Sequence, residues 1–514
     1  MAYRKLRLIL GDQLNHQHSW FDDKDPETLY VMMEMLSETN YVAHHIQKVV
    51  GFFLAMRQFA QELEEKGYEV LYWQLDHKEN KQSVPDNIKY LVDKFNIESF
   101  EYLLPDEYRL DQQLKTLADD LNIPVTAYDT EHFLTKREGV EEFFAGKKRL
   151  IMEYFYRRVR TDYDLLMESD GKTPLTGQWN YDHSNRKKYP KKIDVPKTKK
   201  FERDASEIVE LIESFDIKTI GRIPDKVFDY PISRAEALEA LEDFNDSRLI
   251  HFGDYQDAMS ETERLGYHSR ISFALNVKLI TPLEVVQSSI AHWHKHSDEI
   301  DISQIEGFVR QIVGWREYMR GMYWLQMPEL EEKNYFDHQA KLPDHYWDGN
   351  TKMNCMANAI NQSLDMAYAH HIQRLMVTGN FALLLGVHPD AVDAWYLGIY
   401  IDAIQWVEIT NTRCMSQFAD GGKVATKPYV SSANYIHKMS DYCNNCHYDR
   451  KKKYGDKACP FNSLFWDFYD RNASQLKHIG RINMMMGTWN KMESSEREKI
   501  LQQAAEYKAN ADEL

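Results

Sequence analysis

The chain has 514 residues, with 63 basic and 80 acidic side chains and a formal net charge of −17. Hydrophobic residues make up 43% and charged residues 28%, an ordinary globular composition that excludes bulk disorder. No apolar run approaches the roughly 18 residues of a membrane span, and the N-terminal apolar stretch is too short for a signal peptide. Five cysteines are too few for a disulfide scaffold, so we expect the reducing environment of the cytoplasm. We also expect a monomer that does not associate with membranes.

The first 135 residues alternate short apolar runs with amphipathic stretches. Five runs predict strands, at 6–10, 29–34, 69–74, 100–104 and 125–128. Apolar residues at helical spacing predict helices at 41–67, 84–94 and 110–121. This alternation predicts an α/β N-terminal domain over residues 1–135, built on a doubly wound parallel sheet with helices on both faces.

Gly11-Asp12-Gln13-Leu14 directly follows the first predicted strand. It falls at the carboxyl edge of the sheet, where open α/β folds bind ligands. An ordinary turn between strand and helix would occupy the same position. The placement therefore leaves a ligand site and a plain turn as alternatives.

Residues 136–205 form the predicted interdomain linker, and residues 206–514 carry helical periodicity that predicts an all-α domain. Within the linker, 183–203 holds nine Lys or Arg against two acids, with two prolines and no helical period. A charge run of this kind is either a solvated linker or a strap that contacts nucleic-acid phosphates. The sequence leaves both interpretations open.

The sharpest local motif is Cys443-Asn-Asn-Cys446, followed after twelve residues by Cys459 and a proline. Three thiolates at this spacing can converge on one metal centre, which then needs a fourth ligand. The candidates for that ligand are Cys355, Cys414 and His447. A Cys₃His set suits structural zinc, whereas four cysteines with a proline after the last resemble iron–sulfur ligation. The spacing does not decide between them.

Four further clusters combine polar and aromatic side chains. They are Tyr255 with 268–272, then 307–318, 368–374 and 402–411. On an α-helix Gln311, Trp315 and Tyr318 share one face, which is either core or a wall for a planar heterocycle. The pair His370 and His371 is a better acid–base candidate than a lone histidine, because imidazole titrates near neutrality.

In this order, the clusters resemble the photolyase/cryptochrome family, and most closely its iron–sulfur bacterial subgroup, the prokaryotic (6-4) photolyases. The resemblance covers essentially the whole chain. Besides the cysteines it rests on the segments 10–14, 152–156, 310–321, 369–374 and 418–422.

The resemblance implies three cofactors. The helical domain would bind FAD through Tyr255, His268, Ser269, Ser272, Gln311, Arg316, Arg374, Asp402, Glu408 and Asn411. The α/β domain would bind the antenna chromophore 6,7-dimethyl-8-ribityllumazine through Asp12, Gln13, Glu38 and Tyr41. A [4Fe–4S] cluster would be held by Cys355, Cys443, Cys446 and Cys459. Cys414 matches no ligand and would be a free core thiol.

The activity implied by the resemblance is light-driven repair of (6-4) pyrimidine–pyrimidone lesions by an electron from reduced FAD. The lesion would be flipped out of UV-damaged DNA, single- or double-stranded. His371, with His370 beside it, matches the catalytic proton donor, while the second histidine of the animal enzymes is Leu375 here, a departure known for the bacterial subgroup. Trp395, Tyr396 and Trp347 match the electron route from the surface, although ordinary packing is an alternative.

Two other functions compete with repair. One is a blue-light photoreceptor of the same fold, a cryptochrome that signals through flavin reduction. The other is a non-catalytic nucleic-acid-binding module that uses an iron–sulfur helical domain. A yellow, flavin-bearing protein would eliminate the second.

Overall fold

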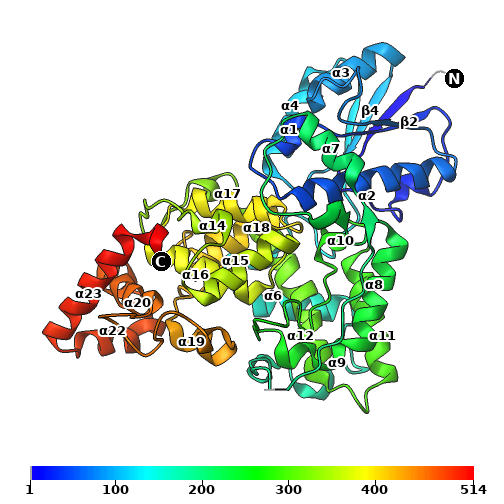
Figure 1. Cartoon of the computed structure of the whole chain (residues 1–514). Coiled ribbons are helices and arrows are strands. Elements are labelled where there is room, and N and C mark those ends of the chain that lie inside the picture. Colours follow the sequence, from blue (N-terminus) through cyan, green and yellow to red (C-terminus); the bar gives the residue numbers. More distant parts are fainter. Residues whose placement is uncertain (1–2, 191) are drawn as a thin grey trace.

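The structure is a computed structural model that describes residues 3–190 and 192–514. Figure 1 shows the α/β domain at one end, a large helical body beside it, and a C-terminal helical lobe at the far side of that body. No helix in the described part of the chain is both long and apolar enough to cross a membrane.

The N-terminal domain is a five-stranded sheet in the order β3-β2-β1-β4-β5, and every neighbouring pair of strands is parallel. The strands are β1 (Lys5–Leu8), β2 (Thr28–Met33), β3 (Val70–Trp73), β4 (Ser99–Leu103) and β5 (Val125–Tyr128). The intervening helices are α1 (Leu36–Thr39), α2 (Ile46–Glu65), α3 (Val84–Phe95) and α4 (Tyr108–Asp120). The predicted parallel α/β sheet is confirmed.

Side chains of β1 and β2 alternate between two cores, because successive residues of a strand point to opposite faces. Leu6 and Leu8 pack with the apolar faces of α3 and α4. Tyr30 and Met32 pack instead with α2 and join the core that continues into the helical body. One face of the sheet is thus covered within the domain, and the other forms part of the interdomain core.

The helical body contains, in chain order, α8 (Arg234–Ser247), α9 (Leu249–Tyr255), α10 (Ser272–Asn276), α11 (Pro282–Lys295), α12 (Ile302–Val309), α13 (Glu317–Gln326), α14 (His345–Asp348), α15 (Asn354–Met366), α16 (Asn380–Leu385), α17 (Pro389–Ile399) and α18 (Gln405–Ile409). The C-terminal lobe contains α19 (Ala433–Met439), α20 (Pro460–Arg471), α21 (Ala473–Leu476), α22 (Asn483–Asn490) and α23 (Ser494–Ala509). This predominantly helical architecture confirms the predicted fold class. The one small departure is a two-residue antiparallel pair, β6 (Arg203–Asp204) with β7 (Val227–Phe228).

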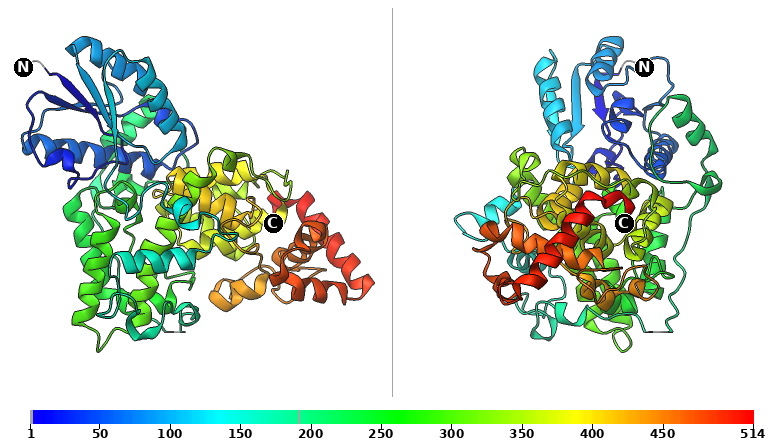
Figure 2. Two further views of the ribbon diagram at one scale, coloured as in Figure 1. Left: turned by 180° about the vertical axis from the view of Figure 1, so that it is seen from behind. Right: turned by 60° about the vertical axis from the view of Figure 1, so that its left-hand side comes forward.

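The predicted linker has its own structure. Its helices α5 (Gly139–Phe144) and α6 (Met152–Asp162) contact the helical body. The basic stretch that follows runs along the helical body to α7 (Ser206–Ser214), as Figure 2 shows, and α7 contacts α2 of the α/β domain. Lys191 of this stretch lies outside the described residues. The domain limits at 135 and 205 stay a prediction.

The two domains meet closely at Gly398 of α17. The His45 amide donates a hydrogen bond to the Gly398 carbonyl at 2.9 Å. A Cβ at position 398 would lie 2.3 Å from the Ala43 carbonyl oxygen, which belongs to the loop before α2. Glycine at this position therefore permits the close approach of the two backbones.

We expect Gly398→Ala to lower the free energy of unfolding by about 1–3 kcal/mol, the usual cost of overpacking a tight contact. Chemical denaturation of the purified proteins measures this difference. Gly487→Ala is the matched control, because a Cβ there meets no atom within 4 Å. The control should be neutral or slightly stabilising through helix propensity, and equal destabilisation of both variants would contradict the argument.

Candidate functional site

The described part of the helical body contains three π-helical segments, Arg310–Arg316, Gln373–Gly379 and Thr410–Ser416, of which the last two contact each other. Gln311, Arg374 and Asn411, one from each, are partly exposed although most of their neighbours are buried. A π-turn shifts side chains out of the α-helical register and is frequent at functional sites. Each segment therefore leaves one polar side chain accessible in an otherwise buried core, and the accessible region around Arg374 and Asn411 is called the hollow below.

The register shift changes the expected face of the first segment. Gln311 and Trp315 are partly exposed, whereas Tyr318 is completely buried and donates a hydrogen bond to the Leu150 carbonyl at 2.6 Å. The sequence left the face of Gln311, Trp315 and Tyr318 as either core or a ligand wall, and Tyr318 belongs to the core. That face was derived from a 3.6-residue period, which does not hold through a π-helical segment.

Arg374 is fixed on two sides. Its guanidinium donates to both carboxylate oxygens of Asp402, at 2.9 and 3.1 Å, and stacks 3.8 Å above the ring of Tyr400. The Asn276 amide holds the Asp402 backbone carbonyl at 2.6 Å. This arrangement gives the hollow a rigid, charge-paired Arg–Asp unit, which can orient the polar edge of a planar ligand.

Glu408 differs from Asp402 because it has no cation in contact. Its side chain is buried, and its Oε1 atom lacks a hydrogen-bond partner. Burial, and next the charge of Asp393, raise the pKa of Glu408 well above the usual range. An orphaned buried carboxyl oxygen beside Asn411 fits a ligand that offers hydrogen-bonding atoms, as the flavin ring system does.

The two adjacent histidines occupy different environments. His371 is exposed to the hollow, yet burial, and next the charge of Arg374, lower its pKa to about 4. His370 is buried and stacks on His268, with ring centroids 4.7 Å apart and Nδ1 of His370 unpartnered. His371 is thus the histidine placed to meet a substrate, and the role of His370 stays a prediction.

The other expected FAD residues are less closely grouped. Tyr255 lies between Tyr189 and Tyr267, and the hydroxyls of Ser269 and Ser272 make no protein hydrogen bond within the described ranges. Arg316 is buried elsewhere: it reaches His132 Nε2 at 3.0 Å and lies over the rings of Phe133 and Trp406. Arg316 therefore belongs to the interdomain contact as much as to the hollow.

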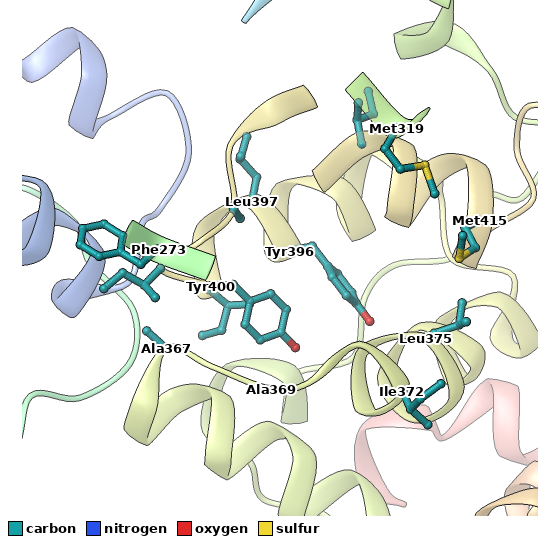
Figure 3. Packing of buried hydrophobic residues seen from close by; sticks show 14 of the residues in the cluster. Phe273, Met319, Ala367, Ala369, Ile372, Leu375, Tyr396, Leu397, Tyr400 and Met415 are labelled. Carbon is teal, nitrogen blue, oxygen red and sulfur yellow. The ribbon is translucent and has the colours of Figure 1, made fainter. Parts of the chain in front are cut away.

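Aromatic rings lead from the surface to Arg374. Trp347 is 46% exposed on α14, and its neighbour Tyr346 contacts the buried Trp395 at 5.1 Å between ring centroids. Trp395 in turn contacts Tyr396 at 5.1 Å, and the Tyr396 hydroxyl donates to the Arg374 carbonyl at 2.7 Å. Figure 3 shows Tyr396 and Tyr400 near Ile372 and Leu375 in the core. Sequence reasoning missed Tyr346 and Tyr400, because both look like ordinary core residues.

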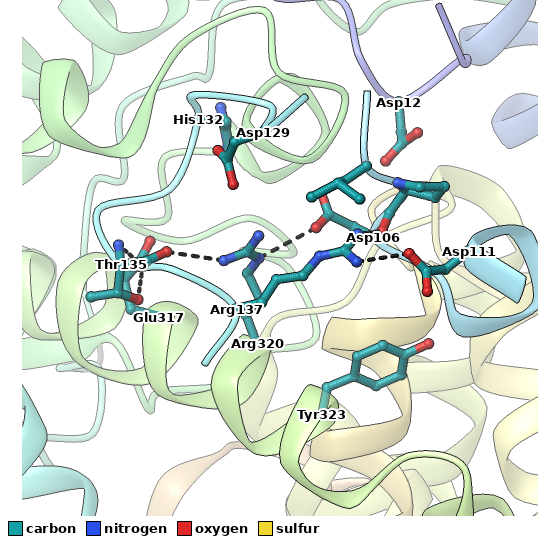
Figure 4. A network of polar contacts seen from close by, with 12 residues as sticks. Asp12, Asp106, Asp111, Asp129, His132, Thr135, Arg137, Glu317, Arg320 and Tyr323 are labelled. Atoms are coloured by element: carbon teal, nitrogen blue, oxygen red, sulfur yellow. Dashed lines mark hydrogen bonds and ion pairs between the residues drawn. The ribbon is translucent and has the colours of Figure 1, made fainter. Parts of the chain in front are cut away.

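At the edge of the sheet, Asp12 enters a buried ionic network with the helical body. Lys278 Nζ lies 3.0 Å from Asp12 Oδ2 and 2.9 Å from Asp106 Oδ2, and its own backbone is left-handed (φ 67°). Figure 4 shows Asp12 above Asp106, with Arg320 linking Asp106 to Thr135 and Arg137 paired with Asp111. Burial opposes ionisation of Asp106, but Lys278, Arg320 and Arg137 lower its pKa to about 2.

Of the remaining antenna candidates, one is buried and hydrogen-bonded to the backbone, and the others are accessible to a ligand. Gln13 is buried and bridges the Leu10 amide and the Leu103 carbonyl, so it closes the turn after β1. Tyr41 is 40% exposed, with the Arg109 guanidinium 4.7 Å from its ring, and Arg109 pairs with Glu38 at 2.7 Å. Beside them the buried His44 has both ring nitrogens unpartnered. Tyr41, Glu38 and the orphaned His44 fit a flat, polar-edged chromophore.

The four cysteines come from three parts of the fold: Cys355 on α15, Cys443 and Cys446 around residues 442–446, and Cys459 at the start of α20. All of them are free thiols. Burial, and next the nearby Cys459, Cys446 and Cys443, raise the pKa of Cys355. No three His, Cys, Asp or Glu side chains of the described chain converge closely enough for a single metal ion.

The charges of Cys459, Cys446 and Cys443 act on Cys355, so the four thiols lie in one region of the fold. Cys414 is buried next to Asp420 instead, and the ring of His447 packs on Tyr448. A four-thiol set fits an iron–sulfur cluster in the chemistry of its donors, since thiolate is the usual ligand of such clusters.

We expect Lys278→Met to lower the free energy of unfolding by about 3–5 kcal/mol, because it leaves the buried Asp12 without its cation and Asp106 with Arg320 as its remaining ion-pair partner among the described residues. Urea titration followed by circular dichroism measures the loss. Lys218→Met is the control: Lys218 pairs with Asp216 at 2.6 Å, but both side chains are at least 80% exposed. Such a pair contributes less than about 1 kcal/mol. A Lys278 variant as stable as the control would show that the network does not hold the domains together.

A family model described as deoxyribodipyrimidine photo-lyase-related protein matches residues 7–228. The chain is 41% identical over 512 residues to the (6-4) photolyase of Agrobacterium fabrum (strain C58 / ATCC 33970), covering 99% of this chain and 100% of the relative. Among solved structures, a bacterial class III photolyase from Agrobacterium tumefaciens aligns with a TM-score of 0.58 at 16% identity, over 85% of this chain and 84% of the other. The cryptochrome of Synechocystis sp. PCC6803 aligns with a TM-score of 0.51 at 12% identity, over 93% and 88%.

Proposed function

Because the chain belongs to the photolyase/cryptochrome family, with a full-length relative among the (6-4) photolyases, we propose that it repairs (6-4) photoproducts in UV-damaged DNA by a light-driven reaction. The observation that carries the proposal is His371, which opens onto the same hollow as the Arg374–Asp402 pair. A proton donor and a flavin-orienting pair are thereby within one site.

FAD, when bound, supplies the electron that light sends to the lesion. The residues of this chain bind and orient it: Arg374 and Asp402 fix one edge of the ring, and Gln311 and Asn411 offer amides from the π-helical segments. The hydroxyls of Ser269 and Ser272 are free for the phosphates. The apolar walls around them exclude water from the reacting region.

His371 holds the proton that repair needs at the lesion. In the free protein its imidazole is neutral at pH 7, because burial and Arg374 both lower its pKa. A bound lesion brings phosphate charge, which favours the protonated imidazole. Binding of damaged DNA would therefore charge His371 at the point where its proton is used.

Two further cofactors belong to the proposal. Cys355, Cys443, Cys446 and Cys459 would hold a [4Fe–4S] cluster that ties α15 and α20 to the loop between α19 and α20. Tyr41, Glu38 and Asp12 would bind 6,7-dimethyl-8-ribityllumazine at the edge of the sheet. Trp347, Trp395 and Tyr396 would carry electrons inward to restore reduced FAD.

The basic stretch 183–203 would contribute to DNA binding with only part of its charge. Lys187, Lys199 and Lys200 pair with Asp254, Glu239 and Asp229 of the helical body. Within the described residues, Lys192 and Lys197 have no ion pair. The paired lysines fasten the stretch, and the unpaired ones are available to phosphates.

Blue light should drive the wild-type protein to repair an oligonucleotide carrying one defined (6-4) lesion, and His371→Ala should lower the rate by about 10²-fold or more, the usual contribution of a general acid. The wild-type rate should rise as the pH falls from 8 to 6, because the protonated fraction of His371 increases. Chromatography of the digested product measures repair at each pH.

The His371 variant should keep its flavin absorbance and its affinity for damaged DNA. Repair by the variant at the wild-type rate would remove His371 from the mechanism. A wild-type protein that photoreduces its flavin but repairs neither (6-4) lesions nor cyclobutane dimers would favour the photoreceptor function.

Cys446→Ser should lose iron and the broad visible absorbance of the cluster, and should be recovered in lower soluble yield, because metal binding contributes to folding. Iron and sulfide analysis of the purified protein measures this. Cys414→Ser is the control and should retain the full iron content, since Cys414 is buried beside Asp420. Stoichiometric zinc without iron in the wild type would contradict the cluster.

A further inference from the structure

Two buried carboxyl groups, Asp393 and Glu408, lie near enough for the charge of one to act on the other. Asp393 belongs to α17 and Glu408 to α18, and these two helices contact each other. The residues are only 8% and 6% exposed, and Asp393 Oδ1 and Glu408 Oε1 both lack a hydrogen-bond partner in the described chain. Two ionised carboxylates in such a place would repel each other at low dielectric.

Arg413 favours ionisation of one of the two. Its Nε atom donates to Asp393 Oδ2 at 2.6 Å, and its Nη2 atom pairs with Asp390 at the exposed end of α17. Glu408 forms no ion pair in the described chain. The single guanidinium therefore stabilises the Asp393 carboxylate and leaves Glu408 as the group that must be neutral.

The electrostatic surroundings agree with this division. Burial, and next the charge of Asp393, raise the pKa of Glu408 well above its usual range. Burial also raises the pKa of Asp393, but the ion pair with Arg413 opposes that rise, and Glu408 has no such partner in the described chain. The other charged or titratable groups that face the pair are Asp390, Glu331, Lys48 and Cys414.

We propose that Asp393, held ionised by Arg413, is a positioning residue that keeps Glu408 protonated, so that the Glu408 carboxyl donates a hydrogen bond into the flavin site. The inference rests on the proposed function and on the family resemblance, which implies that Glu408 contacts the flavin ring. A carboxylic acid that is kept neutral by its surroundings can serve as a hydrogen-bond donor at pH 7. A carboxylate in its place would repel an electron-rich ring and weaken its binding in the reduced form.

Infrared difference spectroscopy of the dark, flavin-loaded protein tests the proposal. Glu408→Gln should remove one C=O band of a protonated carboxylic acid. Asp393→Asn should remove the same band at pH 7, because the unpaired Arg413 charge then favours the Glu408 carboxylate and lowers its pKa by roughly one to three units. The band should return in that variant when the pH is lowered, and Asp393→Glu should retain it at pH 7.

Asp390→Asn is the matched control, since Asp390 shares Arg413 with Asp393 but is exposed at the surface. Its spectrum should keep the Glu408 band. If the band persists at full intensity in Asp393→Asn, Asp393 does not control Glu408. If Glu408→Gln removes no band from the wild-type spectrum, Glu408 is ionised and the proposal is wrong.

A second measurement covers the case in which Asp393→Asn does not fold. Gln is isosteric with a protonated Glu, so Glu408→Gln should fold and bind flavin. The folded wild type retains a proton at Glu408 that the unfolded chain releases above about pH 4.5, so this group makes the stability of the wild type decrease relative to that of Glu408→Gln as the pH rises from 5 to 8. The difference between the melting temperatures of the two proteins should therefore change over this range, and a difference that is independent of pH would overturn the proposal.

These measurements do not depend on repair. A protein that shows the expected bands but repairs no lesion would contradict the proposed function and leave the role of Asp393 standing. A protein that repairs (6-4) lesions but keeps the Glu408 band in Asp393→Asn would contradict only the inference.

Discussion

A buried ammonium group ties the edge of the sheet to the helical body. Lys278 of the helical body pairs with Asp12 and Asp106, which follow the adjacent parallel strands β1 and β4. Parallel strands end at the same edge of a sheet, so the topology itself brings the two carboxylates together. Leaving them there without a cation would be costly, and this cost fixes where the α/β domain sits on the helical body.

The same short segment reaches the flavin side of the molecule. Asn276, two residues before Lys278, donates to the Asp402 carbonyl and accepts from Arg316. Asp402 in turn holds Arg374 in a bidentate pair. The edge of the sheet at Asp12 and the Arg374–Asp402 pair are therefore positioned by one piece of backbone, which under the proposed function would hold the antenna and the flavin at a fixed separation. Rigid separation of this kind is what transfer of excitation energy between two pigments requires.

Within the site, the acidic side chains have different protonation states because their surroundings differ. Asp402 is paired with Arg374, whereas Glu408 has no cation and is driven toward its neutral form. His371 is kept neutral by burial and by Arg374 until a negatively charged ligand arrives. Different surroundings give neighbouring carboxyl groups different pKa values. One carboxyl group can then act as a hydrogen-bond acceptor and another as a donor, although both belong to acidic residues. The hollow is thus prepared for an electron-rich ring on one side and a proton donor on the other.

The sequence by itself determined the strands, the order of α/β and helical regions, and the cysteine motif, because apolar periodicity and short spacings report on local backbone and burial. The full family pattern also identified Arg374, Asp402 and His371. Only the tertiary structure decided that Tyr318 belongs to the core, since a π-helical segment breaks the period that put it on one face with Gln311 and Trp315. It also decided the ion-pair partners of Lys278 and of Asp393. These partners are distant in the sequence, so no periodic pattern in the chain predicts them.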